Sequence, residues 1–114
     1  MPRKEFTCSG YGSMWLFVLF DLPVKTKKER KIYAKFRKDL LEDGFSMIQY
    51  SVYIRFCASE EIATTHRRIV RKSIPASGHV RILSLTDRQF EKMENYIGRM
   101  EIPPEKAPCQ LMLF

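Results

Sequence analysis

The residue best placed to do chemistry is Asp21, which ends an apolar run and precedes the Leu22-Pro23 turn. A carboxylate there can bind a hard divalent cation such as Mg²⁺ or Mn²⁺, and that cation can activate water against a phosphodiester. A simpler and commoner role is also open, because aspartate often begins a turn. One carboxylate per chain supplies few ligands for a firm metal site, and a two-fold dimer would bring both copies of Asp21 to one axis.

A strongly basic segment follows Asp21. Residues 25–38 carry eight Lys and Arg against Glu29 alone, and this net +7 equals the formal net charge of the whole 114-residue chain. Such a surface can follow the phosphate backbone of a nucleic acid, and an ordinary solvated helix face is the alternative. The arginines of a second cluster could instead complement a helix dipole. The predicted nucleic-acid-binding residues are Lys25, Lys27, Lys28, Arg30, Lys31, Lys35, Arg67, Arg68 and Arg71.

Other residues whose side chains could catalyse or bind also have ordinary packing roles open to them. His66 lies among apolar positions, which favours a packed core histidine over a general base. Tyr11, Tyr50 and Tyr53 could stack on nucleobases, although tyrosines in strands usually pack across the sheet. No nucleotide-binding or common hydrolase motif occurs in the chain.

The cysteine and hydropathy patterns limit the compartment. Cys8, Cys57 and Cys109 are odd in number, far apart and without a CxxC pair, which predicts a reducing cytoplasm rather than a disulfide framework or a zinc site. The longest apolar run, Met14 to Phe20, is too short to span a membrane. We therefore expect a cytoplasmic protein with no membrane partner.

The elements that must position Asp21 and the basic segment follow from apolar spacing and capping signals. Residues 14–20 are apolar on both faces, which predicts a buried strand that ends at Asp21. Thr26 and Glu29 have the spacing of a capping box, and Gly44 stands where a helix C-cap would, so a helix is predicted between them.

The rest of the chain predicts two more strand segments, a second helix and a turn. Residues 45–57 are β-branched and aromatic and predict two short strands or one bent ribbon. Residues 79–85 predict another strand, and Thr86 with Gln89 repeats the capping-box spacing. A second helix is predicted from Ser59 to about Ile74, with four residues facing inward: Ile62, His66, Ile69 and Val70.

This order predicts an α+β protein with a ferredoxin-like βαββαβ arrangement, in which two helices cover one face of an antiparallel sheet. We expect residues 1–12 to form a flexible arm, 13–98 the ferredoxin-like domain, and 99–114 a proline-containing connector and a C-terminal strand. The terminal QLMLF has no obvious partner in so small a sheet. Exchange of this extra strand with a second subunit in a homodimer would pair it.

The chain resembles the CRISPR-associated protein 2 family in three stretches: FVLFDLP (17–23) with the basic helix after it, GFSMIQYSVYIR (44–55) and HVRILSLTDRQFEKM (79–93). The likeness covers residues 13–98 and is greatest to members from type II systems. It implies a ferredoxin-like homodimer with exchanged C-terminal strands that serves spacer acquisition beside the CRISPR-associated integrase. Members are described as metal-dependent endonucleases on RNA or double-stranded DNA, and also as non-catalytic scaffolds that hold prespacer DNA.

The resemblance also implies roles for individual residues. The family's catalytic and metal-binding aspartate falls on Asp21, and the basic pair that follows it falls on Lys28 and Arg30. The aromatic residue of the QxSV-aromatic motif falls on Tyr53, after Ser51, which makes both candidate supporting residues.

Two departures from the family pattern bear on catalysis. Phe20 stands where some members have tyrosine, and Met47 stands where some have arginine. A missing arginine near the metal would weaken stabilisation of charge in the transition state. Three functions therefore stay open: a metal-dependent endonuclease, a DNA-binding scaffold without catalysis, and a toxin-like ribonuclease of the same fold.

Overall fold

The structure, a computed structural model, describes residues 12–108. The predicted exchange of the C-terminal strand falls outside these residues. All of the predicted arm except Gly12 also falls outside them, and so do Cys8, Tyr11 and Cys109. Within residues 12–108 no helix is long and apolar enough to cross a membrane.

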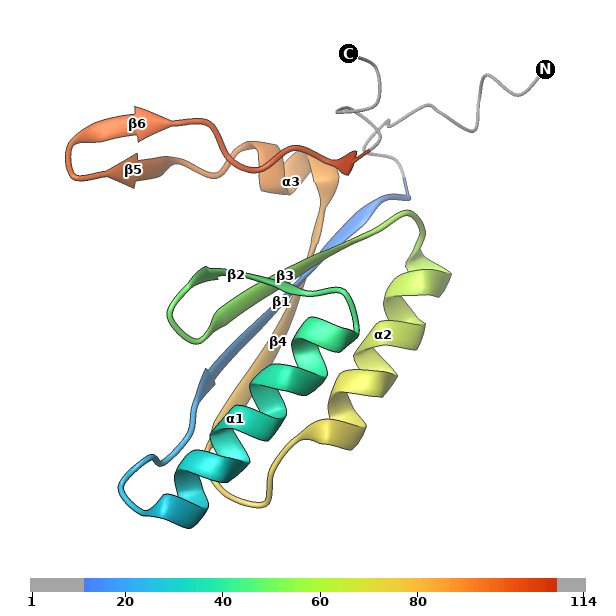
Figure 1. The fold of residues 1–114 in the computed structure, drawn as a ribbon. Coiled ribbons are helices and arrows are strands. Elements are labelled where there is room, and N and C mark those ends of the chain that lie inside the picture. Colours follow the sequence, from blue (N-terminus) through green and yellow to red (C-terminus); the bar gives the residue numbers. More distant parts are fainter. Residues whose placement is uncertain (1–11, 109–114) are drawn as a thin grey trace.

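The described chain forms a four-stranded antiparallel sheet in the order β2-β3-β1-β4. Its strands are β1 (Met14–Asp21), β2 (Ser46–Gln49), β3 (Val52–Cys57) and β4 (His79–Thr86). The two long helices, α1 (Lys27–Glu42) and α2 (Glu60–Ser73), both lie on one face of this sheet (Figure 1). The predicted α+β, ferredoxin-like fold is confirmed, and residues 45–57 form two short strands rather than one ribbon.

The core between the sheet and the helices comes from alternate residues of β1 and the inner stripes of α1 and α2. Leu16 and Val18 are fully buried, and they share one cluster with Phe36, Leu40 and Val70. Two-residue alternation in β1 and four-residue spacing in α1 bring these side chains to one layer.

The expected inner face of α2 is partly wrong. Ala63 and Val70 are buried, whereas Ile62 and Ile69 are about two-fifths exposed. Ala63 and Val70 are seven residues apart, and so are Ile62 and Ile69. Each isoleucine lies one position before a buried residue, which turns its side chain by about 100° around the helix. The small Ala63 lies against the sheet, and the larger isoleucines are displaced toward solvent.

The other face of the sheet is covered at one end only. Trp15 and Phe17 of β1 form a second cluster there with Phe90 and Ala107. Phe90 belongs to a short helix, α3 (Asp87–Glu91), which is followed by a hairpin of β5 (Asn95–Ile97) and β6 (Met100–Ile102) that projects beyond the sheet (Figure 1). The hairpin was not predicted, and it crosses the boundary expected between residues 98 and 99.

Candidate functional site at the end of β1

Strand alternation places Asp21 on the sheet face that lacks α1 and α2. Trp15 and Phe17 point to this face, and successive odd positions of β1 do the same. Asp21 is paired with His79 of β4, Leu19 with Arg81, and Phe17 with Leu83, so these side chains share the face. We call the part that α3 leaves uncovered the open face; it consists of Leu19, Asp21, His79, Arg81 and Leu83.

A shallow cavity of about 230 Å³ lies on the open face and is lined by Leu19, Phe20, Asp21, His79 and Arg81. Asp21, His79 and Arg81 are exposed, and no other described residue forms a hydrogen bond or an ion pair with the Asp21 carboxylate. Sequence reasoning did not select His79 or Arg81, because the β1–β4 register that joins them to Asp21 cannot be read from either strand alone. The carboxylate is therefore accessible beside an imidazole and a guanidinium.

Gly78 fixes the approach of β4 to Asp21. Its φ is +100°, and a Cβ built on it would stand 3.0 Å from the Asp21 carbonyl oxygen and closer still to Leu22. Only glycine meets both conditions without strain. The backbone of Asp21 is thus held against the chain that enters β4.

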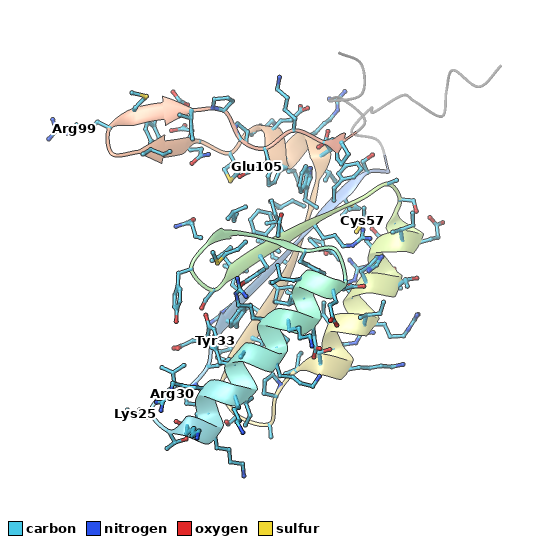
Figure 2. All side chains as sticks on the ribbon, viewed as in Figure 1. Lys25, Arg30, Tyr33, Cys57, Arg99 and Glu105 are labelled. Atoms are coloured by element: carbon cyan, nitrogen blue, oxygen red, sulfur yellow. The ribbon has the colours of Figure 1, made fainter. Side chains whose placement is uncertain are left out.

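The loop between Asp21 and α1 is held by the first turn of that helix. The Glu29 carboxylate accepts hydrogen bonds from the backbone N–H groups of Lys25 and Thr26 at 2.9 and 3.0 Å, and the Thr26 hydroxyl accepts one from the Glu29 N–H at 3.0 Å. This is the predicted capping box. The Arg30 guanidinium donates to the carbonyl oxygens of Val24 and Lys25 at 3.1 and 3.0 Å. Figure 2 shows Arg30 near Lys25 at this end of α1. Arg30 therefore shapes the loop as well as contributing charge.

Three of the predicted basic residues face a groove between α1 and α2. Lys28, Lys31 and Lys35 line a cavity of about 520 Å³ together with Lys72 of α2, which sequence reasoning did not select. Lys35 is engaged by Asp39, with nitrogen-to-oxygen distances of 3.0 and 3.1 Å. These lysines lie in the helical layer, on the opposite side of the sheet from the open face.

The arginines of α2 fall into two groups. Arg67 is committed to local contacts, because it donates to the Glu60 carboxylate at 2.6 Å and to the Ser84 hydroxyl at 2.8 Å. Arg68 and Arg71 are exposed. Asp21 shares its face of the sheet with none of the lysines of α1.

The β2–β3 turn lies against the end of β1 through Ser51. Its carbonyl oxygen accepts a hydrogen bond from the Phe20 N–H at 3.1 Å, and its hydroxyl is 2.9 Å from that of Tyr33. Tyr53 is 1% exposed and stacks with Phe20 at a centroid distance of 5.7 Å. Of the two candidate supporting residues, Tyr53 can thus act on Asp21 only through the core, and Ser51 only by holding the turn.

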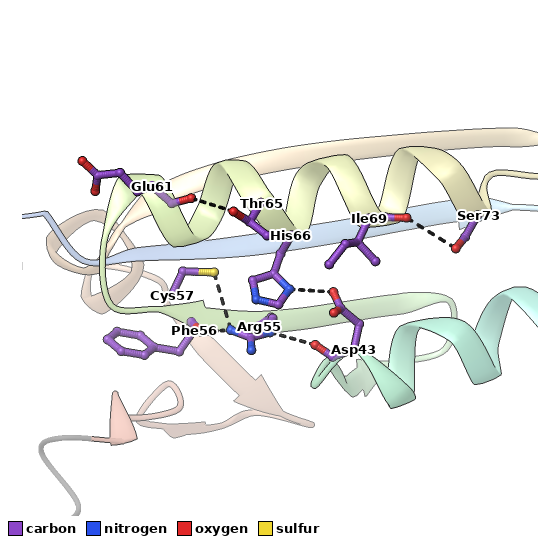
Figure 3. A network of polar contacts seen from close by, with 9 residues as sticks. All are labelled: Asp43, Arg55, Phe56, Cys57, Glu61, Thr65, His66, Ile69 and Ser73. Carbon is purple, nitrogen blue, oxygen red and sulfur yellow. Dashed lines mark hydrogen bonds and ion pairs between the residues drawn. The ribbon is translucent and has the colours of Figure 1, made fainter.

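His66 belongs to a separate polar network at the far end of α1 (Figure 3). Its Nδ1 is 2.8 Å from the Asp43 carboxylate, and Arg55 donates to the Asp43 carbonyl oxygen at 2.8 Å. Asp43 caps the C-terminus of α1, whereas Asp21 precedes its N-terminus, and a 16-residue helix is about 24 Å long. His66 therefore joins α2 to α1 and takes no part in the chemistry of Asp21.

Whether a metal ion can bind at this site depends on how many carboxylates the site supplies to the ion. Within residues 12–108 no three His, Cys, Asp or Glu side chains lie close enough together to hold a metal ion. Mg²⁺ and Mn²⁺ prefer several oxygen ligands. Asp21 of one chain is therefore an incomplete site, although it is the right kind of ligand for either ion.

The fold and this site define a class of small ferredoxin-like protein with an exposed aspartate at the end of the first strand and a basic first helix. The sequence model of CRISPR associated protein Cas2 matches residues 14–93, which include Asp21 and both long helices. The chain belongs to this family.

Whole-chain relatives agree with this assignment. The chain is 50% identical over 104 residues to a CRISPR-associated endoribonuclease Cas2 from Flavobacterium psychrophilum, covering 91% of this chain and 90% of that protein. It is 52% identical over 101 residues to a protein of the same name from Parvibaculum lavamentivorans, covering 89% of this chain and all of that protein. A third, from Paracidovorax avenae, is 48% identical over 106 residues and covers 93% and 98% of the two chains.

Proposed function

We propose that this protein acts in CRISPR adaptation, as a homodimer that binds double-stranded prespacer DNA together with the CRISPR-associated integrase. The observation that carries the proposal is the placement of the net +7 of residues 25–38 on the loop after β1 and on the solvent-facing side of α1. A duplex presents one phosphate charge about every 1.7 Å along its axis, and such a surface can meet several of them. The likeness of this helix to members from type II systems suggests that subtype.

The open face supports a two-fold dimer. Leu83 is 47% exposed at the end of this face nearest α3, with Leu19 on the neighbouring strand, and apolar side chains left in water favour association. A two-fold axis through this face would bring Asp21 of each subunit toward the other. Substitution of Leu83 by glutamate would then give a monomer in light scattering or sedimentation, and an unchanged dimer would place the contact elsewhere.

The proposed enzymatic activity is metal-dependent hydrolysis of a phosphodiester. Two copies of Asp21 would supply the carboxylates that one chain lacks, and bound Mg²⁺ or Mn²⁺ would activate water and offset developing negative charge. Within each chain, Gly78 and the capped loop hold the Asp21 backbone in place, and Arg81 offers positive charge in the same cavity.

A second candidate activity is cleavage of RNA. The relatives described above are named endoribonucleases, which favours RNA as the substrate that these proteins cut. The remaining alternatives are a scaffold in which Asp21 is structural and a toxin-like ribonuclease of the same fold. A toxin-like ribonuclease would act without a CRISPR integrase or a CRISPR array.

Binding and cleavage are tested with different variants. Lys28→Glu should weaken duplex affinity and reduce the slope of log K against log salt, because one cationic contact becomes repulsive. Lys92→Glu, an equal change of charge beyond α3, is the matched control and should leave that slope unaltered. Equal slopes for wild type and Lys28→Glu would refute phosphate binding at this helix.

Asp21→Asn tests the role of the carboxylate in the purified protein with either metal. Loss of cleavage with binding retained supports the catalytic proposal. Cleavage at the wild-type rate would refute it, and spacer acquisition that persists in cells carrying the variant would favour the scaffold.

A further inference from the structure

Tyr50 is the most exposed of the large apolar side chains in the part of the chain that the structure describes, with 76% of its surface accessible. It lies in the two-residue turn between β2 and β3. Most of this ring therefore meets water.

One face of the Tyr50 ring is nevertheless packed against another aromatic side chain. It stacks on Tyr33 of α1 with a centroid distance of 6.1 Å and an interplanar angle of 19°. The Tyr33 hydroxyl is 2.9 Å from that of Ser51, and the Tyr33 ring contacts Phe20 at 5.6 Å. The positive φ of Ser51, +63°, sets the turn itself. One face of the Tyr50 ring therefore rests on a fixed support, and the opposite face is free.

The turn that carries this ring lies next to the end of β1 and the basic loop, on the side of α1. The turn is tied to the end of β1 by the Phe20 N–H to Ser51 carbonyl bond, one residue before Asp21. Arg30 and Tyr33 are three positions apart on α1 and so lie on one side of the helix, with Lys25 in the loop before it (Figure 2). A strand whose phosphates meet Lys25 and Arg30 would pass a flat aromatic surface at Tyr50.

We propose that Tyr50, backed by Tyr33, is a stacking platform for an unpaired nucleobase of a single-stranded nucleic acid bound along the basic loop. The inference rests on the proposed nucleic-acid binding and deepens it, because a paired base inside a duplex offers no free face to a side chain. Stacking is tolerant of base identity, so RNA and DNA are both accommodated. Tyr33 is a positioning residue, since it acts on the base only through Tyr50.

The test measures anisotropy of short fluorescein-labelled oligo(dT) and oligo(U), and of a blunt DNA duplex, in EDTA so that no cleavage consumes the probe. Tyr50→Ala should weaken binding of the single strands about five- to a hundredfold, the usual value of one base–aromatic stack. Tyr50→Phe, which keeps the ring, should stay close to wild type, and the duplex should bind all variants alike. Tyr96→Ala is the matched control, because Tyr96 is 52% exposed on the β5–β6 hairpin, in a separate sheet from the β2–β3 turn.

Each outcome decides the proposal. A loss of affinity confined to oligo(dT) or to oligo(U) shows whether the stacked base belongs to DNA or to RNA. A loss no greater than that of Tyr96→Ala, or an equal loss on the blunt duplex, overturns the stacking role while the salt-dependent binding by Lys28 still stands. A wild-type protein that binds none of the three probes overturns this inference and the proposed function together.

Discussion

The single tryptophan offers a sharp test of how the covered end of the sheet is held together. The Trp15 Nε1–H donates to the Asp87 carboxylate at 2.7 Å, and Asp87 is 2% exposed. The second oxygen of this carboxylate is buried and has no hydrogen-bond partner among residues 12–108. The indole also stacks on Phe90 at 4.1 Å, so one side chain joins β1 to α3.

Two substitutions of Asp87 separate the hydrogen bond from the charge. A hydrogen bond to a charged group contributes about 1.5–3 kcal/mol, so Asp87→Ala should lower the free energy of unfolding by about 2 kcal/mol. Asp87→Asn keeps an acceptor for the indole and removes a buried charge with an unpartnered oxygen, so its cost should be less than about 1 kcal/mol. Asp39→Ala, which removes a surface pair with Lys35, is the control and should cost about 0.5 kcal/mol or less.

The assay is urea unfolding followed by Trp15 fluorescence and by far-ultraviolet circular dichroism. If the two signals give the same transition, the data can be fitted to a two-state model to obtain the free energy of unfolding. If Asp87→Ala changed stability no more than Asp39→Ala, the buried bond would be unimportant. If Asp87→Asn cost as much as Asp87→Ala, the charge itself rather than the acceptor would be the stabilising feature, and the reasoning would be refuted.

Three further predictions follow from the positions around the site. Gly78→Ala should destabilise the fold by about 1 kcal/mol or more in urea unfolding, because alanine is strained at a φ of +100° and its Cβ meets Asp21 and Leu22; unchanged stability would show that this approach is loose. A hydrogen bond with Tyr33 raises the pKa of the Tyr50 phenol, so Tyr33→Phe should lower the Tyr50 pKa in an ultraviolet titration that uses Tyr50→Phe to isolate the Tyr50 signal, and an unchanged Tyr50 midpoint would contradict the contact. Burial raises the pKa of the Cys57 thiol, so the folded state keeps its proton to higher pH than the unfolded chain does. The free energy of unfolding should consequently fall as pH rises above the ordinary thiol range, and Cys57→Ser should flatten that decline.

Local signals in the sequence predicted the local structure well. The capping boxes at Thr26 and Thr86 and the N-cap at Ser59 are all confirmed. These signals succeed because each partner lies within three residues of the cap, so the hydrogen bonds form whatever the rest of the fold does. The strand order followed from the same elements, since few arrangements connect them without crossing.

Features that depend on strand register or on very short strands were not predicted from the sequence. His79 and Arg81 join Asp21 through the pairing of β1 with β4, which relates residues about 60 positions apart. The β5–β6 hairpin has three residues in each strand, too few for a two-residue alternation to stand out from a connector. Its turn at Gly98, with a φ of +62°, was the one available signal.

The division of the site between two faces decides what catalysis would require. The lysines of α1 lie in the helical layer, and Asp21 lies on the open face across the sheet. If two subunits pair through their open faces, the lysines stay on the outside and the two carboxylates come to the seam between subunits. Nucleic acid bound along α1 would then reach Asp21 only by passing the loop at Lys25 and the ring of Tyr50. Holding a duplex needs the outer surface alone, whereas cleavage needs a strand that enters the seam, so a single-stranded substrate suits the catalytic proposal better than a rigid duplex.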